Sequence, residues 1–447
     1  MSKFSPSLTS RVFRPDRRRA LQTLGVSALA LAARPLWAAT KPTPVVVLTA
    51  YPDEVLSRFE AAFEQAYPQY RLQLIWRMPH DALPYLEQPG QGGVDVYWSA
   101  SPRNFARLHQ EGAWRPLPVA LEGLPDHIGK TELRNSAATY TATEMAGYGF
   151  ACNEPLLKQL GVPLPRDWRD LADPRLAGRI ALPIPARVGF APVMVDLVLQ
   201  AYGWDEGWTL WSQIAAQSRL VDRGATFVGD EVAEGRAAVG LSIDFFVQSA
   251  IANGAPIRFV YPTHGGINPA QIAVTAAAPH GDGAAAFVQF VLSQTGQKLL
   301  THGDIRKLPV RPTVYEGLPA DYHRPFQAAA QGAYDYDGPR TRDRLSLVAA
   351  LFQQMLIEPQ GQQADLWRRT RLARERGAGP QALADVSRLL GVPPLSEAQA
   401  ADPALLAAYR DRVEGDESPV TAVEAAWRAA CAQRRAQADQ ALKELGV

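Results

Sequence analysis

The spacing of apolar residues changes several times along this 447-residue chain and divides it into segments. Between residues 44 and 312, short apolar runs alternate with stretches whose apolar residues recur at helical spacing. Residues 45–48 form a β-branched run, and residues 53–67 follow with apolar positions three or four apart. Such alternation predicts βαβ units and a mainly parallel sheet. Further strands are expected at residues 70–76, 95–98, 178–182, 238–243, 257–261 and 271–276, and further helices at residues 102–112, 188–202, 205–217, 230–236, 245–253 and 283–292.

Beyond residue 312 the strand pattern stops, and Ala, Arg, Gln and Leu dominate. Helices are predicted at residues 344–357, 362–376, 380–390 and 419–445. Ser418 and Pro419 suit the start of the last one, because serine caps helix N-termini and proline fits the first turn. This helical tail either packs on the α/β part or presents a docking surface to a partner.

The N-terminal segment has a third pattern, in which basic residues precede an apolar run. Five arginines lie between Arg11 and Arg19, residues 20–33 are apolar, small or weakly polar, and small residues end the segment at Ala38 and Ala39. These are the parts of a secretory signal, and the run is shorter than the roughly 20 residues of a membrane span. Residues 1–39 are therefore predicted to be a cleaved signal peptide that directs the protein to the periplasm. Residues 16–22 resemble a twin-arginine motif with Ala20 in place of its phenylalanine, so the Tat and Sec routes both stay open.

Charge limits the choice of partner. The whole chain has a formal charge of +1, and removal of residues 1–38 takes away seven basic residues and one acid, which leaves −5. Nucleic acids are bound by basic surfaces, so they are excluded as partners. An apolar fraction of 47% supports packed cores rather than disorder.

The sequence contains no motif of an enzyme or a metal site. A nucleophile elbow, a zinc-binding His-Glu-x-x-His and a complete phosphate loop are all missing, and the seven histidines are scattered. Cys152 and Cys431 are predicted to be buried free thiols, although a disulfide between them stays open in an oxidising compartment. We therefore expect a protein that is not an enzyme and holds no cofactor or metal. The alternative, an enzyme exported folded with its cofactor, has only the twin-arginine pattern in its favour.

Several predicted strands end in a polar or glycine-containing turn that opens a helix. In open α/β sheets, ligands bind outside the carboxyl ends of the strands, where helix N-termini favour anions. Hydroxyl groups add donors there, and the guanidinium of Arg187 matches a phosphate or carboxylate. The alternatives are helix capping for the serines and Asp244, a surface ion pair for Arg187 and packing for the tyrosines. The candidate ligand-binding residues are Thr49, Tyr51, Ser99, Ser101, Arg187, Val188, Gly189, Asp244 and Tyr261.

These turns, in this order, resemble those of the extracytoplasmic solute-binding proteins that serve bacterial ABC importers. Within that family the chain is similar to the branch of ferric-iron, phosphonate and sugar-phosphate binders. The ferric members use adjacent tyrosines, which this chain lacks, so iron is not the expected ligand. The segments that carry the resemblance are residues 95–102, 148–153, 168–171, 176–181, 229–235, 284–287 and 292–300.

The resemblance implies a class II periplasmic-binding-protein fold, in which two α/β lobes close on a ligand about a hinge, here with a C-terminal all-helical extension. Residues 45–147 with 263–312 would form one lobe, residues 154–256 the other, and residues 313–447 the extension. The crossings between the lobes are expected near residues 148–153 and 257–262. It further implies a monomer that binds a small organic anion, phosphorylated or carboxylated, and delivers it to an ABC permease. The tail also resembles that of sensing members that report external phosphoglycerate to a membrane histidine kinase, and this alternative stays open.

Overall fold

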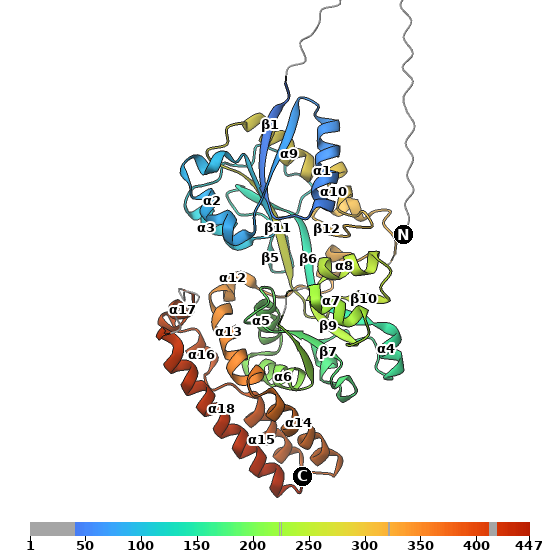
Figure 1. Ribbon diagram of the computed structural model, residues 1–447, viewed down its shortest axis with the longest axis vertical. Helices are drawn as coiled ribbons and strands as arrows, with labels where there is room; N and C mark the ends of the chain where they lie inside the picture. The colour runs from blue at the N-terminus through green and yellow to red at the C-terminus, as the bar shows by residue number, and fades with distance from the viewer. Residues whose placement is uncertain (1–40, 223, 225, 321, 411–417) are drawn as a thin grey trace, which may run out of the picture. The chain divides into compact units, whose positions relative to one another are not determined.

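The protein is built around one mixed β-sheet flanked by helices (Figure 1). The computed structural model describes residues 41–410, except 223, 225 and 321, and residues 418–447, so the predicted signal peptide lies outside the described residues. The strand order is β2-β1-β3-β11-β6-β9-β7-β8, and β10 and β12 pair with β6. The strands are β1 Thr43–Thr49, β2 Tyr70–Trp76, β3 Val96–Ser99, β6 Tyr140–Asn153, β7 Ile180–Pro183, β8 Ser218–Val221, β9 Val239–Ile243, β10 Ile257–Val260, β11 Ile267–Val274 and β12 Leu308–Pro309; β4 His127–Ile128 and β5 Thr131–Glu132 form a separate hairpin.

The two halves of the sheet belong to two α/β lobes, as the sequence predicted. In lobe 1, β1 pairs in parallel with β2 and β3, and buried aromatic residues such as Phe63 and Trp98 fill the core. In lobe 2, β7 pairs in parallel with β8 and β9, over a core that contains Trp168 and Trp211. Lobe 1 has the helices α1 Asp53–Ala66, α2 Pro79–Leu86, α3 Pro102–Gln110, α9 Gly281–Leu292 and α10 Gln294–Leu299; lobe 2 has α4 Glu154–Gln159, α5 Ala191–Tyr202, α6 Trp204–Ala216, α7 Thr226–Ala233 and α8 Asp244–Ala252.

The expectation of a mainly parallel sheet is wrong at its centre. β11 runs antiparallel to both β3 and β6, and β6 runs antiparallel to β9 and β10. The cause is that β6 and β11 carry the chain between the lobes in opposite directions, so they lie side by side as an antiparallel pair. Crossing strands of this kind need no connecting helix, and the strand–helix alternation elsewhere in the chain does not reveal them.

Within the residues that the structure describes, three connections join the lobes. The first is β6, whose residues 140–147 pair with β11 and whose residues 148–153 pair with β9 and β10. The second connection is residues 261–266, between β10 and β11. The third connection lies in the C-terminal extension. It is the segment between Tyr334, which is buried in the core of lobe 1, and Tyr336, which is buried in the core of lobe 2. Tyr334 has a φ of 64°, an uncommon conformation for a bulky residue.

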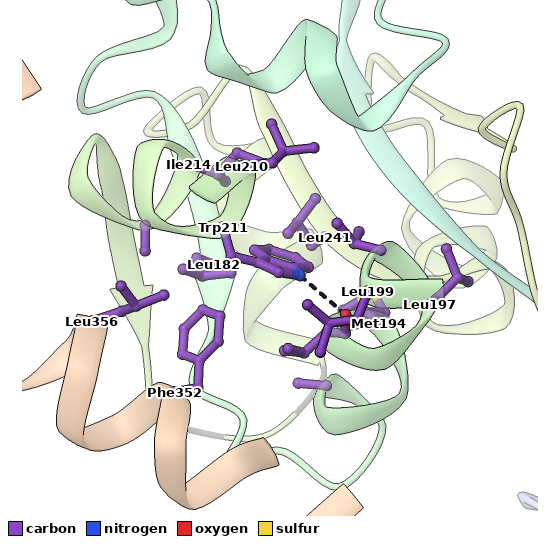
Figure 2. Packing of buried hydrophobic residues seen from close by; sticks show 14 of the residues in the cluster. Leu182, Met194, Leu197, Leu199, Leu210, Trp211, Ile214, Leu241, Phe352 and Leu356 are labelled. Carbon is purple, nitrogen blue, oxygen red and sulfur yellow. Dashed lines mark hydrogen bonds between the residues drawn. The ribbon is translucent and has the colours of Figure 1, made fainter. Parts of the chain in front are cut away.

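The C-terminal tail is helical, as predicted, and packs on lobe 2. Helices α13 (Leu345–Phe352), α14 (Gln360–Glu375) and α15 (Pro380–Gly391) contact α5 and α6, and Figure 2 shows Phe352 of the tail beside Trp211 of lobe 2. The described tail helices are α11 Pro325–Ala330, α12 Gly338–Thr341, α13 Leu345–Phe352, α14 Gln360–Glu375, α15 Pro380–Gly391, α16 Glu397–Ala400, α17 Pro403–Arg410 and α18 Ser418–Glu444, with a π-helical turn at Gln353–Ile357 after α13.

The interface between the tail and lobe 2 is closely packed and partly polar. A Cβ atom added to Gly391 of α15 would lie 2.5 Å from Cα of Thr209 in α6, so only glycine fits at this contact. Arg344 donates from Nε to Oδ1 of Asp196 in α5 at 2.5 Å, and both side chains are buried. The tail is thus an integral part of the lobe 2 core.

One further sequence expectation concerns the cysteines. Cys152 and Cys431 are both buried and free, and burial raises the pKa of both thiols. Within the described ranges, no helix has the length and apolar character of a membrane-spanning segment.

Candidate functional site

The carboxyl ends of β1 and β3 place four of the predicted ligand-binding residues in lobe 1. Thr49 and Ser99 are fully buried at these ends, and Thr49 Oγ1 accepts a hydrogen bond from the Tyr51 amide at 3.2 Å. Ser99 Oγ has no hydrogen-bond partner in the part of the chain that the structure describes. Ser101 stands at the N-cap position of α3, but its hydroxyl accepts no capping hydrogen bond.

Tyr51 belongs to a buried polar cluster that also contains Thr143, Glu144 and Lys307. The carboxylate of Glu144, fully buried in the middle of β6, accepts hydrogen bonds from the hydroxyls of Tyr51 and Thr143. It also accepts one from Lys307 Nζ at 3.2 Å. Burial, followed by the charge of Glu144, raises the pKa of Tyr51 well above its ordinary value, so this phenol stays protonated and donates.

Lys307 lies between aromatic rings of the two lobes. Its ammonium is 4.6 Å from the ring centroid of Tyr51 in lobe 1 and 5.0 Å from that of Phe245 in lobe 2. The whole residue is only 9% exposed. An ammonium has three donors, and Glu144 is its only hydrogen-bond partner among the described residues. This places a positive charge with spare donors where the lobes meet.

Asp244 connects two of the three segments that join the lobes. It is 1% exposed, and its Oδ2 accepts from the Gly147 amide of β6 at 2.9 Å and from the Tyr261 hydroxyl at 2.8 Å. Burial raises the pKa of Asp244 to about 6, because the charged form loses its hydration. Its Oδ1 makes no hydrogen bond to any described group.

Tyr261 stacks on His323, with ring centroids 3.6 Å apart. His323 Nε2 in turn shares a hydrogen bond with the hydroxyl of Tyr334. Burial lowers the pKa of His323 to about 4, so the imidazole is neutral at physiological pH. Tyr261 and His323 border a cavity of about 300 Å³ that is also lined by Arg258 and Arg306.

The turn before α5 holds the three remaining predicted residues. Val188 is buried, whereas Gly189 and Arg187 are exposed. The Arg187 side chain is 60% exposed and forms an ion pair of 3.3 Å with Asp222. The structure therefore places Tyr51 and Asp244 in one cluster, because Tyr51 and Phe245, the residue after Asp244, both lie against Lys307. Tyr261 joins this cluster through its hydrogen bond to Asp244. Arg187 lies outside the cluster.

Sequence reasoning missed Glu144, Lys307 and His323. Glu144 carried a usable signal, since it is the only charged residue in the run 140–153, and an acid in a fully buried strand needs a partner. Lys307 and His323 gave no such signal, because their surroundings come from segments distant in the sequence. Across residues 41–447, apart from the gaps given above, no group of three His, Cys, Asp or Glu side chains is arranged to hold a metal ion.

Comparisons with known proteins agree with this architecture. Residues 94–328, more than half of the chain, match the family model described as bacterial extracellular solute-binding protein. The phosphoglycerate transport regulatory protein PgtC of Salmonella typhimurium is 27% identical over 332 residues, which cover 73% of this chain and 80% of PgtC.

Solved structures with the same fold include the periplasmic binding protein AfuA and the protein HitA. AfuA from Actinobacillus pleuropneumoniae, with exogenous fructose-6-phosphate bound, has a TM-score of 0.54 at 19% identity and covers 70% of this chain and 100% of its own. Iron-bound HitA from Pseudomonas aeruginosa has a TM-score of 0.51 at 18% identity and covers 65% of this chain and 98% of its own. The family match, supported by this fold, shows that the chain belongs to the bacterial extracellular solute-binding proteins.

Proposed function

We propose that the protein captures a small organic anion between its two lobes in the periplasm and delivers it to an ABC importer. The observation that carries this proposal is Lys307, whose ammonium lies between a ring of lobe 1 and a ring of lobe 2. An anion bound to this ammonium touches groups of both lobes at once. Such a ligand stabilises the closed arrangement by the difference in its affinity for the closed and open forms.

The predicted residues complete this site with uncharged donors and a second cation. Ser99 offers a buried hydroxyl that has no hydrogen-bond partner among the described residues, and Thr49 and Ser101 lie beside it at the same edge of the sheet. On lobe 2, Arg187 leaves its ion pair with Asp222 and binds the ligand. This change costs little, because an exposed ion pair stabilises a protein by less than about 1 kcal/mol. Val188 and Gly189 belong to the turn that precedes α5 and border the ligand there. Asp244 and Tyr261 border it beside the segments that connect the lobes.

The ligand class is an anion with a phosphate or a carboxylate group. PgtC is named for phosphoglycerate transport, and AfuA holds fructose-6-phosphate. Both names point to phosphorylated compounds, and a guanidinium and an ammonium bind either group. Family members bind rather than transform their ligands, so we assign no catalytic role to these residues.

Calorimetric titration of the purified protein tests this function. The probes are 3-phosphoglycerate, fructose-6-phosphate and 2-aminoethylphosphonate, each titrated into the wild type, Lys307→Met and Arg187→Ala. We expect at least one probe to bind and each variant to weaken its binding by about tenfold or more, which corresponds to one lost charge-assisted contact. Near-UV circular dichroism checks that Lys307→Met keeps its fold.

Two controls carry the same charge change away from the site. Lys298→Met alters an exposed lysine of α10, and Arg179→Ala alters an exposed arginine just before β7, at the opposite end of that strand from Arg187. Both should leave the affinity unchanged. Equal affinities in the wild type, Lys307→Met and Arg187→Ala refute the site, and ferric ion as the only ligand refutes the organic anion.

A second candidate function is ligand sensing together with a membrane histidine kinase. The word regulatory in the name of PgtC favours it, as does a helical tail that is joined to both lobes. Neighbouring genes separate the two functions: a permease and an ATPase next to this gene support import, whereas a kinase and a response regulator support sensing.

A further inference from the structure

A second cavity, of about 340 Å³, lies between lobe 1, lobe 2 and the tail. Lobe 1 supplies Arg103 of α3 and Gln271 of β11, and β6 supplies Tyr148. The tail supplies Tyr336 and Arg342. None of Tyr51, Asp244 and Lys307 lines this cavity, although its Arg103 lies two residues after Ser101 of the proposed site.

Two guanidinium groups that line the cavity have no side-chain partner among the described residues. Neither the guanidinium of Arg103 nor that of Arg342 forms a hydrogen bond or an ion pair with any residue that the structure describes, although Glu132 and Asp343 also line the cavity. The two arginines come from different parts of the chain, one from lobe 1 and one from the tail. Each guanidinium binds a carboxylate or phosphate through two parallel hydrogen bonds. A ligand with two acidic groups therefore satisfies both arginines at once.

The cavity also has a buried acceptor that lacks a donor. Gln271 is 4% exposed, and its Oε1 has no hydrogen-bond partner within the described part of the chain. A buried acceptor left without a donor costs about 1–3 kcal/mol, and such atoms are rare in folded proteins. A carboxylate cannot donate to this oxygen, but a hydroxyl group can. The missing donor therefore points to a hydroxylated ligand.

We propose that this cavity is a second ligand site for a small organic anion with two acidic groups and a hydroxyl. The ligand joins Arg103 of lobe 1 to Arg342 of the tail and donates its hydroxyl to Gln271. Because the tail packs on lobe 2, a ligand in this cavity holds both lobes in the arrangement that the tail allows. The proposal goes beyond anion capture at Lys307, because the site depends on the tail.

Calorimetric titration with L-malate and succinate tests the site, since the two dicarboxylates differ only in the hydroxyl group. We expect L-malate to bind and succinate to bind at least about fivefold more weakly. Arg103→Gln and Arg342→Gln should each weaken L-malate binding by about tenfold, the effect of one lost charge-assisted contact. Gln271→Leu should remove the preference for L-malate over succinate.

Arg340→Gln is the matched control, because Arg340 is exposed, lies two residues from Arg342 and does not line the cavity. It should leave the affinity unchanged. The proposal is overturned if L-malate does not bind at millimolar concentration, or if Arg342→Gln binds it as the wild type does. Loss of L-malate binding in Lys307→Met but not in Arg342→Gln also overturns it and assigns L-malate to the site between the lobes instead.

Discussion

Replacing Asp244 by asparagine should change how the stability of the protein depends on pH. The carboxyl group is buried, and its Oδ2 accepts from the Gly147 amide and the Tyr261 hydroxyl. An asparagine oxygen accepts the same two hydrogen bonds without a charge. The variant therefore keeps the geometry of the hinge and removes only the ionisation.

The sign follows from the direction of the pKa shift. Burial raises the pKa of Asp244 from 3.8 to about 6. Between these values the native state binds more protons than the unfolded state, so the free energy of unfolding falls as the pH rises. A pKa difference of about 2.2 corresponds to roughly 3 kcal/mol in total. The wild-type free energy of unfolding loses about 2 kcal/mol of this between about pH 4.5 and pH 7.5. The asparagine variant does not lose it, because asparagine does not ionise.

Urea denaturation of the wild type and Asp244→Asn at these two pH values measures the effect. The free energy of unfolding of the variant relative to that of the wild type should be higher at pH 7.5 than at pH 4.5 by about 2 kcal/mol. Groups that titrate equally in both proteins cancel in this double difference. A value near zero for Asp244→Asn would refute the reasoning.

Two further predictions concern the contact between the tail and lobe 2. Arg344→Met leaves the buried carboxylate of Asp196 without its cation and should lower the free energy of unfolding by about 3 kcal/mol; a loss below about 1 kcal/mol in urea denaturation contradicts the ion pair. Gly391→Ala places a Cβ against the backbone of Thr209 and should cost about 1–3 kcal/mol. Gly361→Ala, in the open first turn of α14, should be neutral or slightly stabilising, so equal effects of the two alanines rule out the close contact.

The sequence predicted most of the secondary structure, because its helices and strands have regular apolar spacing. The predicted helix over residues 380–390 and the long C-terminal helix agree with α15 and α18 within one residue at each end. The start of α5 differs more, since the helix was expected from Val188 and begins at Ala191. Residues 188–190 form the turn that precedes it, in which Val188 is buried and Phe190 is half-buried.

The long crossing strand β6 was recognised only in its second half. Its residues 140–147 include Thr141, Thr143 and Glu144, so they lack an uninterrupted apolar run. These polar side chains are buried because partners from distant segments satisfy them, as Lys307 does for Glu144. Local periodicity carries no information about such partners. For the same reason, the turns at Thr49 and Asp244 could be proposed as parts of a site from the sequence, whereas Lys307, whose ammonium lies between the rings of Tyr51 and Phe245, could not.

All three connections between the lobes meet in one buried chain of contacts. Asp244 accepts from Gly147 in the first connection and from Tyr261 in the second. Tyr261 stacks on His323, which shares a hydrogen bond with Tyr334 in the third. A change in the angle between the lobes must either break one of these contacts or move Tyr334, whose φ of 64° already restricts its backbone. The proposed closure on a ligand is therefore mechanically connected to the segment that leads into the tail.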